Sequence, residues 1–225
     1  MKLTIEMVSD LVCPWCWLGL RRLQGAIALV PEFEVEVLFR PFELDPTIPA
    51  EGVDYKEYMK QRFGSDQGRE RSSAMKDALI AYSEEDGIPF AFDRITRRPN
   101  SFDAHRLVRW AQGQGHGVAA KEKLFEAYFA NGEDIGEKEV LVRIASEIGL
   151  DGDLVAELLE RGADVETTRD EQTLFRKMGI AGVPTYIAHR QIAVQGAETS
   201  EKLSRFLKTA AAQIPQERPA SQPIN

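Results

Sequence analysis

The feature that most constrains this chain is a pair of cysteines in the segment Cys13-Pro14-Trp15-Cys16, the only cysteines among its 225 residues. The segment follows an alternating apolar run over residues 3–7, which is typical of a half-buried strand. Apolar residues at helical spacing follow it over residues 17–30. Pro14 suits the first turn of a helix, where its missing N–H costs nothing. The sequence therefore predicts that the cysteines lie where a helix begins after a strand.

This position predicts redox chemistry. A cysteine at a helix N-terminus faces unpaired backbone N–H groups and the positive end of the helix dipole, and both favour the thiolate. Cys13 is therefore the expected nucleophile. Cys16, one turn further and more buried, can attack a mixed disulfide on Cys13 and release the partner. Pro14 and Trp15 are expected to support the site, the Trp15 ring by shaping the surface around Cys13. The alternative is two core cysteines that are neighbours without a redox role.

In the rest of the chain, segments with apolar residues at strand spacing and segments with apolar residues at helical spacing follow one another. Residues 33–39 predict a second strand, so the opening is a strand–helix–strand unit with a parallel pair. Short strands are expected at 186–188 and 192–194, joined as a hairpin, and Thr199 or Ser200 can cap a final helix. The two half-sheets should join into one sheet, with the helices between them as a cap. Helices are expected around residues 55–63, 74–82, 104–111, 124–129, 140–148, 154–159 and 165–178.

The predicted organisation is a discontinuous α/β domain interrupted by helices. Residues 1–45 and 179–212 form the α/β part, and residues 46–178 form the insertion. Residues 213–225 are rich in proline and polar residues and are expected to be a disordered tail. A chain of 225 residues can bury an adequate core without disulfide staples.

Composition excludes several classes of function. Lys plus Arg number 28 and Asp plus Glu number 36, and the net charge of −8 argues against nucleic-acid binding. Two cysteines and three histidines without zinc-site spacing predict no metal site, and no other cofactor is expected. The beginning lacks the features of a signal peptide and no stretch is apolar enough for a membrane span, so a cytoplasmic location is expected. In that reducing compartment a Cys-x-x-Cys pair indicates redox cycling rather than a staple.

A later segment, Gly182-Val183-Pro184-Thr185, completes a resemblance. Together with the cysteine motif and the order of elements, it resembles the DsbA family of thioredoxin-fold proteins up to about residue 210. Residues 41–46 and 100–107 are similar to recurrent segments of the FrnE-like branch, which is related to 2-hydroxychromene-2-carboxylate isomerases and kappa-class glutathione transferases. The resemblance implies a thioredoxin fold with a large all-helical insertion. It also implies a cis bond between Val183 and Pro184 that faces the cysteines, beside backbone that pairs with an extended substrate peptide. From the residues alone, a trans proline that opens a strand is equally compatible.

The expected activity is thiol–disulfide exchange with protein or peptide thiols and disulfides, and glutathione is a candidate thiol partner. One alternative is a glutathione-dependent isomerase or transferase acting on a small aromatic compound. Those relatives generally carry serine at the position of Cys13, so the retained pair favours disulfide chemistry. A second alternative is a peptide-binding adaptor without catalysis. The direction of electron flow depends on a reduction potential, which no residue pattern predicts. The client, the recycling reductant and the oligomeric state have no signature in the sequence.

Two further residues are candidates for a ligand groove. Asn100 could bind a ligand, but capping the helix that begins near Ser101 is the favoured interpretation. His105 could bind a carboxylate of the substrate, but a histidine satisfied by Asp103 or Arg106 is favoured. A group of arginines predicts either a local basic patch or a solvated helix face. They are Arg94, Arg97, Arg98, Arg106 and Arg109.

Overall fold

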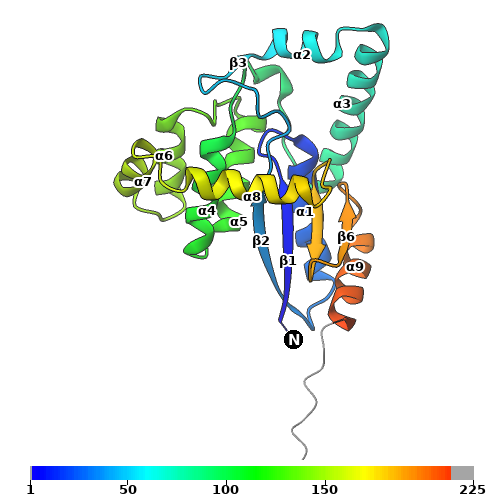
Figure 1. The fold of residues 1–225 in the computed structure, drawn as a ribbon. Coiled ribbons are helices and arrows are strands. Elements are labelled where there is room, and N and C mark those ends of the chain that lie inside the picture. Colours follow the sequence, from blue (N-terminus) through cyan, green and yellow to red (C-terminus); the bar gives the residue numbers. More distant parts are fainter. Residues whose placement is uncertain (1, 214–225) are drawn as a thin grey trace, which may run out of the picture.

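The centre of the computed structural model, which describes residues 2–213, is a four-stranded sheet in the order β2-β1-β5-β6 (Figure 1). β1 and β2 are parallel, while β5 is antiparallel to both β1 and β6. The two segments that the insertion separates therefore join in one sheet, as the sequence predicts. The strands are β1 (Lys2–Ser9), β2 (Glu34–Pro41), β5 (Thr185–Ala188) and β6 (Ile192–Gln195).

Helices cover both faces of the sheet. On one face α1 (Pro14–Ala28) packs against α9 (Ser200–Ala212), and Thr199 caps α9 by accepting a hydrogen bond from the Lys202 amide. On the other face lies α8 (Val165–Lys177), which crosses the sheet in Figure 1. α8 falls within the range expected to be insertion, yet it packs on the sheet.

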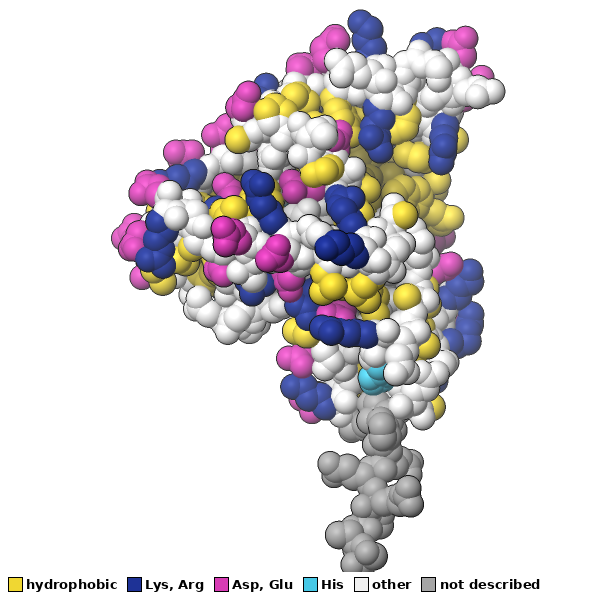
Figure 2. Space-filling view, viewed as in Figure 1, with side chains coloured by type: hydrophobic (Ala, Val, Ile, Leu, Met, Phe, Trp, Pro, Cys, Tyr) yellow, Lys and Arg dark blue, Asp and Glu magenta, His cyan; other side chains and the backbone are white. Residues whose placement is uncertain are grey.

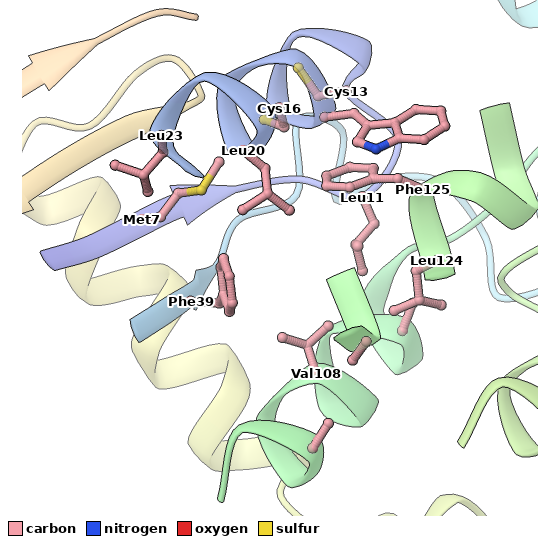
Figure 3. Close-up of a cluster of buried hydrophobic side chains, with 14 of the residues drawn as sticks. Met7, Leu11, Cys13, Cys16, Leu20, Leu23, Phe39, Val108, Leu124 and Phe125 are labelled. Carbon is pink, nitrogen blue, oxygen red and sulfur yellow. The ribbon is translucent and has the colours of Figure 1, made fainter. Parts of the chain in front are cut away.

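The core follows from the alternation of side chains along β1. Leu3, Ile5 and Met7 are fully buried on the side of α1, and Figure 3 shows Met7 beside Leu20 and Leu23 of that helix. The opposite side of β1 contributes to a second, smaller cluster under α8. That cluster consists of Val8, Phe42, Phe175 and Ile187.

Most of the insertion packs against α1 and the β2 edge of the sheet. An aromatic cluster joins it to α1, because the Trp17 ring contacts Phe90, Phe125 and Phe129 at centroid distances of 5.4, 6.0 and 6.2 Å. The elements of this part are η1 (Phe92–Arg94), α4 (Phe102–Gly113), α5 (Gly117–Phe125), the π-helical turn η2 (Glu126–Ala130), α6 (Lys138–Glu147) and α7 (Gly152–Glu160).

The other part of the insertion is an arm that projects from the body (Figure 1). It consists of α2 (Tyr55–Phe63) and α3 (Asp66–Asp86). α3 begins eight residues before the predicted helix at 74–82, because the Ser65 hydroxyl accepts a hydrogen bond from the Gly68 amide and caps it. Apolar spacing misses this start, since residues 66–73 carry no large apolar side chain.

A small strand pair at the base of the arm also escaped prediction. β3 (Val53–Asp54) pairs antiparallel with β4 (Arg97–Arg98), so the insertion is not entirely helical. The predicted tail lies, from residue 214 onward, outside the described residues. No helix within residues 2–213 is both long and apolar enough to span a membrane.

Candidate active site

The two cysteines lie at the start of α1, as Figure 3 shows. Cys13 is the N-cap residue and Pro14 occupies the first turn, as the sequence predicts. The Cys13 amide donates to the Asp10 carbonyl at 3.3 Å, and the Cys16 amide donates to the Cys13 carbonyl at 2.9 Å. Both thiols are free. The loop from β1 and the first helical turn therefore place the pair at one end of the sheet.

The two thiols differ in burial, and the surroundings of Cys16 disfavour its ionisation. Cys16 is completely buried, whereas 4% of Cys13 is exposed. Burial raises the pKa of the Cys16 thiol well above its usual value, the hydrogen bond and charge of Cys13 raise it further, and Lys121 opposes both. These surroundings therefore favour the protonated form of Cys16.

The loop before β5 lies directly against Cys13. The Cys13 thiol donates to the Val183 carbonyl at 3.8 Å, and the bond between Val183 and Pro184 is cis. Gly19 lets α1 come this close. A Cβ there would lie 2.8 Å from Pro184 Cγ and 2.4 Å from Tyr186 Oη. The structure thus brings Cys13, Val183 and Pro184 together from opposite ends of the chain.

Beneath the cysteine loop lies Asp10, which is fully buried and which sequence reasoning missed. Its carboxylate accepts hydrogen bonds from the Leu44 amide at 2.7 Å and the Ser101 hydroxyl at 2.8 Å. Burial alone would raise the pKa of Asp10, but His105, Arg98 and the Leu44 amide outweigh it and lower the pKa to about 2. An acidic residue between a buried strand and the cysteine motif was the available sequence signal.

The prediction for His105 was wrong in its partner. His105 is buried, and its Nε2 lies 3.6 Å from Asp10 Oδ1, whereas Asp103 pairs with Arg106 at 2.7 Å. At that distance Nε2 makes no hydrogen bond within the described chain. Spacing along one helix suggested local partners, but the packing of α4 against the end of β1 supplies a distant one. His105 thus faces Asp10, the buried carboxylate beneath the cysteine loop.

Arg98, a residue of the insertion, contacts the loop that carries Cys13. It is buried, donates to the Val12 carbonyl at 3.1 Å, and stacks over the Tyr58 ring at 5.0 Å. The charge of Asp10 offsets the cost of burying this guanidinium and raises the pKa of Arg98. The loop that carries Cys13 is therefore fixed by charges from two parts of the chain.

A buried lysine lies on the other side of the pair. Lys121 of α5 is 1% exposed, and its Nζ lies over the rings of Phe39 and Phe125 at 5.7 and 5.2 Å. Burial lowers the pKa of Lys121 to about 8, while Cys16, Asp10 and Cys13 pull it upward. Within residues 2–213 no carboxylate forms an ion pair with it. Nothing in the residue pattern of α5 distinguished this lysine from an exposed one.

The remaining predicted residues occupy different surroundings. Trp15 is half-buried and meets Tyr82 of the arm edge-on at a centroid distance of 6.2 Å. The Asn100 side chain accepts from the Phe102 amide at 2.9 Å and donates to the Ile48 carbonyl at 2.7 Å, while Ser101 is the N-cap residue of α4. Trp15 therefore lies next to the cysteines, whereas Asn100 is tied into the backbone around α4.

The arginine group does not form a shared basic patch. Arg98 and Arg106 are buried, Arg106 pairs with Asp103, and Arg109 pairs with Glu171 at 2.9 Å. Arg94 donates to the Ala130 carbonyl and Arg97 lies near Asp134, so each of the five guanidinium groups has a different contact. Within residues 2–213, moreover, no three His, Cys, Asp or Glu side chains are grouped so that they could hold a metal ion.

A parallel β-α-β unit, an antiparallel hairpin, a helical insertion and free cysteines at the first helix define a DsbA-like thioredoxin fold. A family model described as a DSBA-like thioredoxin domain matches residues 4–208, and the chain belongs to that family. A probable DsbA oxidoreductase from Streptomyces coelicolor is 29% identical, with a TM-score of 0.84 over 99% of this chain and 94% of that chain.

Two further solved structures share the fold at lower identity. A 2-hydroxychromene-2-carboxylate isomerase is 16% identical, with a TM-score of 0.68 over 94% of this chain and 95% of that chain. The cytosolic disulfide reductase DsbM from Pseudomonas aeruginosa, solved with glutathione, is 22% identical, with a TM-score of 0.61 over 93% and 100%. At these identities the two neighbours show that the fold is shared.

Proposed function

We propose that this protein is a thiol–disulfide oxidoreductase that acts through Cys13 and Cys16. The observation that carries the proposal is the pairing of two free thiols with different surroundings at one helix N-terminus. Cys13 occupies the N-cap position and its thiol donates to the Val183 carbonyl, whereas Cys16 is fully buried in surroundings that favour its protonated form. One thiol is thus suited to attack and the other to resolve.

In the reducing direction the chemistry has two steps. The Cys13 thiolate attacks one sulfur of a substrate disulfide, so that a Cys13–substrate bond forms and the second substrate sulfur leaves and takes up a proton. Cys16 then gives its proton to solvent and attacks Cys13. The Cys13–Cys16 bond forms and the reduced substrate leaves. The substrate gains two electrons and the pair loses two; an external dithiol or two monothiols such as glutathione restore the pair.

The substrate chain would lie along the Val183–Pro184 loop. The Val183 carbonyl is 3.8 Å from the Cys13 thiol, so an extended peptide that hydrogen-bonds this backbone would bring its own sulfur to Cys13. Trp15, packed against Tyr82, would form the opposite wall. Backbone pairing of this kind gives affinity with little sequence specificity.

The proposal includes a cytoplasmic location, glutathione as a thiol partner, and chemistry without a metal or other cofactor. The structural similarity to DsbM, which is described as a cytosolic disulfide reductase and was solved with glutathione, supports the first two. Two thiols are sufficient for the chemistry, because electrons pass directly between sulfur atoms.

The competing function is a glutathione-dependent isomerase, which the similarity to 2-hydroxychromene-2-carboxylate isomerase favours. An isomerase needs one group to bind or polarise glutathione, so its activity should survive Cys16→Ser. Disulfide exchange should lose its release step in that variant.

The test is the reduction of insulin by dithiothreitol with wild type, Cys13→Ser and Cys16→Ser, each checked for folding by circular dichroism. Wild type should accelerate the reaction and Cys13→Ser should not. Cys16→Ser should accumulate a mixed disulfide with its substrate that mass spectrometry detects. Absence of acceleration by wild type overturns the proposal. Isomerase activity that persists in Cys16→Ser supports the competing function.

A further inference from the structure

A cavity of about 590 Å³ lies between α8, the start of α4 and the loop after β2. Its volume falls in the range of small-molecule binding sites. Neither cysteine lines it, so it is separate from the redox site. Four side chains of α8 line it at positions i, i+3, i+4 and i+7, which places them on one face of the helix. They are Arg169, Gln172, Thr173 and Arg176.

The two arginines of this face are available for a ligand. Both are exposed, and within residues 2–213 neither forms an ion pair with a carboxylate. Arg106 and Arg109 of α4 contrast with them, since each is paired with an acidic side chain. Figure 2 shows Lys and Arg side chains on the face over which α8 runs, interspersed with Asp and Glu side chains. The chain as a whole has a net charge of −8, so unpaired positive charge at a cavity stands out from the rest of the surface. Such charge favours the binding of an anion.

Aromatic rings hold both guanidinium groups in place. The Arg169 group lies 5.1 Å from the Phe102 ring centroid, and the Arg176 group lies 4.3 Å from that of Phe42. Arg176 also donates to the Glu43 carbonyl. A stacked guanidinium keeps its N–H edge free for a carboxylate or phosphate, and its orientation is already fixed before the ligand arrives.

The acidic groups at the cavity are already engaged. Asp103 pairs with Arg106 at 2.7 Å. Glu43 is buried, and Gln172 donates to its carboxyl at 3.0 Å. Burial raises the pKa of Glu43, which favours its uncharged form. The charged side chains at the cavity that have no ion-pair or side-chain hydrogen-bond partner within residues 2–213 are therefore those of Arg169 and Arg176.

We propose that this cavity binds an elongated organic dianion, one anionic group on Arg169 and the other on Arg176. Seven residues of α-helix separate the two positions by about 10 Å. A ligand with a single anionic group, or with two close together, reaches only one arginine. Gln172 and Thr173 lie between them and face the middle of the ligand.

The test is calorimetric titration at low salt with three probes: octanedioate, butanedioate and octanoate. The protein is the Cys13→Ser, Cys16→Ser double variant, so that the result does not depend on the redox proposal. Octanedioate should bind at one site per chain. Butanedioate, which is too short, and octanoate, which has one carboxylate, should each bind about tenfold more weakly or worse, because each forgoes charge-assisted hydrogen bonds.

Substitutions of the two arginines test whether the ligand binds in this cavity. Arg169→Gln and Arg176→Gln should each weaken octanedioate binding by about tenfold or more. Arg161→Gln, an exposed arginine that pairs with Glu157 outside the cavity, is the matched control and should bind as the parent does. The proposal is overturned if octanedioate does not bind saturably, if octanoate binds equally well, or if both cavity variants match the control. Thermal melts establish that each variant is folded.

Discussion

Two helical regions flank the cysteines, and they are held in very different ways. α1 has 15 residues, of which eight are buried. In the arm, α2 buries none of its nine residues and α3 buries two of 21. Helices in proteins owe most of their stability to a packed apolar face. On one side of the cysteines, α1 is therefore held in place by the core. On the other side lies the arm, which should open locally at a low free-energy cost.

The contacts between the two regions combine one buried apolar side chain, Leu79 of α3, with polar and aromatic contacts. Arg22 of α1 pairs with Asp86 at 3.0 Å and lies over the Tyr82 ring at 4.6 Å, and Tyr82 meets Trp15. The comparison predicts that substitutions beneath α1 change the stability of the whole protein, whereas substitutions in the arm act locally.

The largest effect is expected for Asp10→Asn. The substitution keeps an oxygen for the Ser101 hydroxyl but removes the charge that faces buried Arg98 and His105. Leaving a buried cation uncompensated should lower the free energy of unfolding by about 3–5 kcal/mol in urea titrations. Asp77→Asn, on the exposed surface of α3, is the control and should stay within about 0.5 kcal/mol. An equal loss of unfolding free energy in the two variants would contradict the difference between the buried region under α1 and the exposed arm.

The same residue predicts a pH dependence. The pKa of Asp10 is about 2 in the folded protein, below its ordinary value of 3.8. The unfolded chain therefore takes up the proton first as pH falls, and stability is lost between about pH 4 and pH 2. The loss due to this one group is about 2 kcal/mol. Asp10→Asn should lack this component in unfolding titrations over that range.

Lys121→Met should act in the opposite direction. The pKa of Lys121 is about 8 when folded and 10.5 ordinarily, so below pH 8 the folded protein bears the cost of a buried charge. Removing that charge should stabilise the protein at pH 7 by about 1–3 kcal/mol, and wild type should recover the difference between pH 8 and 10.5. Lys60→Met, on exposed α2, should change little. A Lys121→Met variant less stable than wild type at pH 7 would show that the ammonium has a favourable partner.

Gly19→Ala tests the packing of α1 against the loop before β5 without changing any charge. The new methyl would lie 2.4 Å from Tyr186 Oη and 2.8 Å from Pro184 Cγ, so α1 or the loop must move. The expected loss is about 1–3 kcal/mol in urea unfolding, with slower reaction of Cys13 toward a disulfide probe. Gly113→Ala, where a Cβ meets nothing within 4 Å, is the matched control and should be neutral. If both variants unfold alike, the contact of α1 with the loop is not tight.

Local signals in the sequence were enough to predict the elements around the cysteines. The alternation over residues 3–7, Pro14 at a helix start and Thr199 as a cap are short-range features, and each is present in the structure. Joining the two half-sheets needed only the pairing rule for a β-α-β unit followed by a hairpin. The helices of the insertion followed from apolar spacing, except where α3 begins on polar residues.

What the sequence could not predict depends on contacts between distant segments. Asp10 meets Ser101, 91 positions away. His105 faces Asp10 of a distant segment, whereas its near neighbour Asp103 pairs with Arg106. No spacing rule separates a lysine that faces the core from one that faces solvent when both lie on α5. These positions are set by how the insertion docks on the sheet, which is a property of the assembled fold.

The smallest effect is expected for Tyr82→Ala, which tests the arm itself. Tyr82 is 39% exposed and contributes one edge-on contact to Trp15 and one cation–π contact to Arg22. Losing both should reduce global stability by about 1 kcal/mol or less. Hydrogen exchange should nevertheless accelerate across residues 66–86, because α3 buries only two of its 21 residues. Tyr82→Phe keeps the ring and should behave as wild type. If Tyr82→Ala instead destabilises the whole protein as much as Gly19→Ala does, the arm unfolds together with the core, and the two sides of the redox pair are equally rigid.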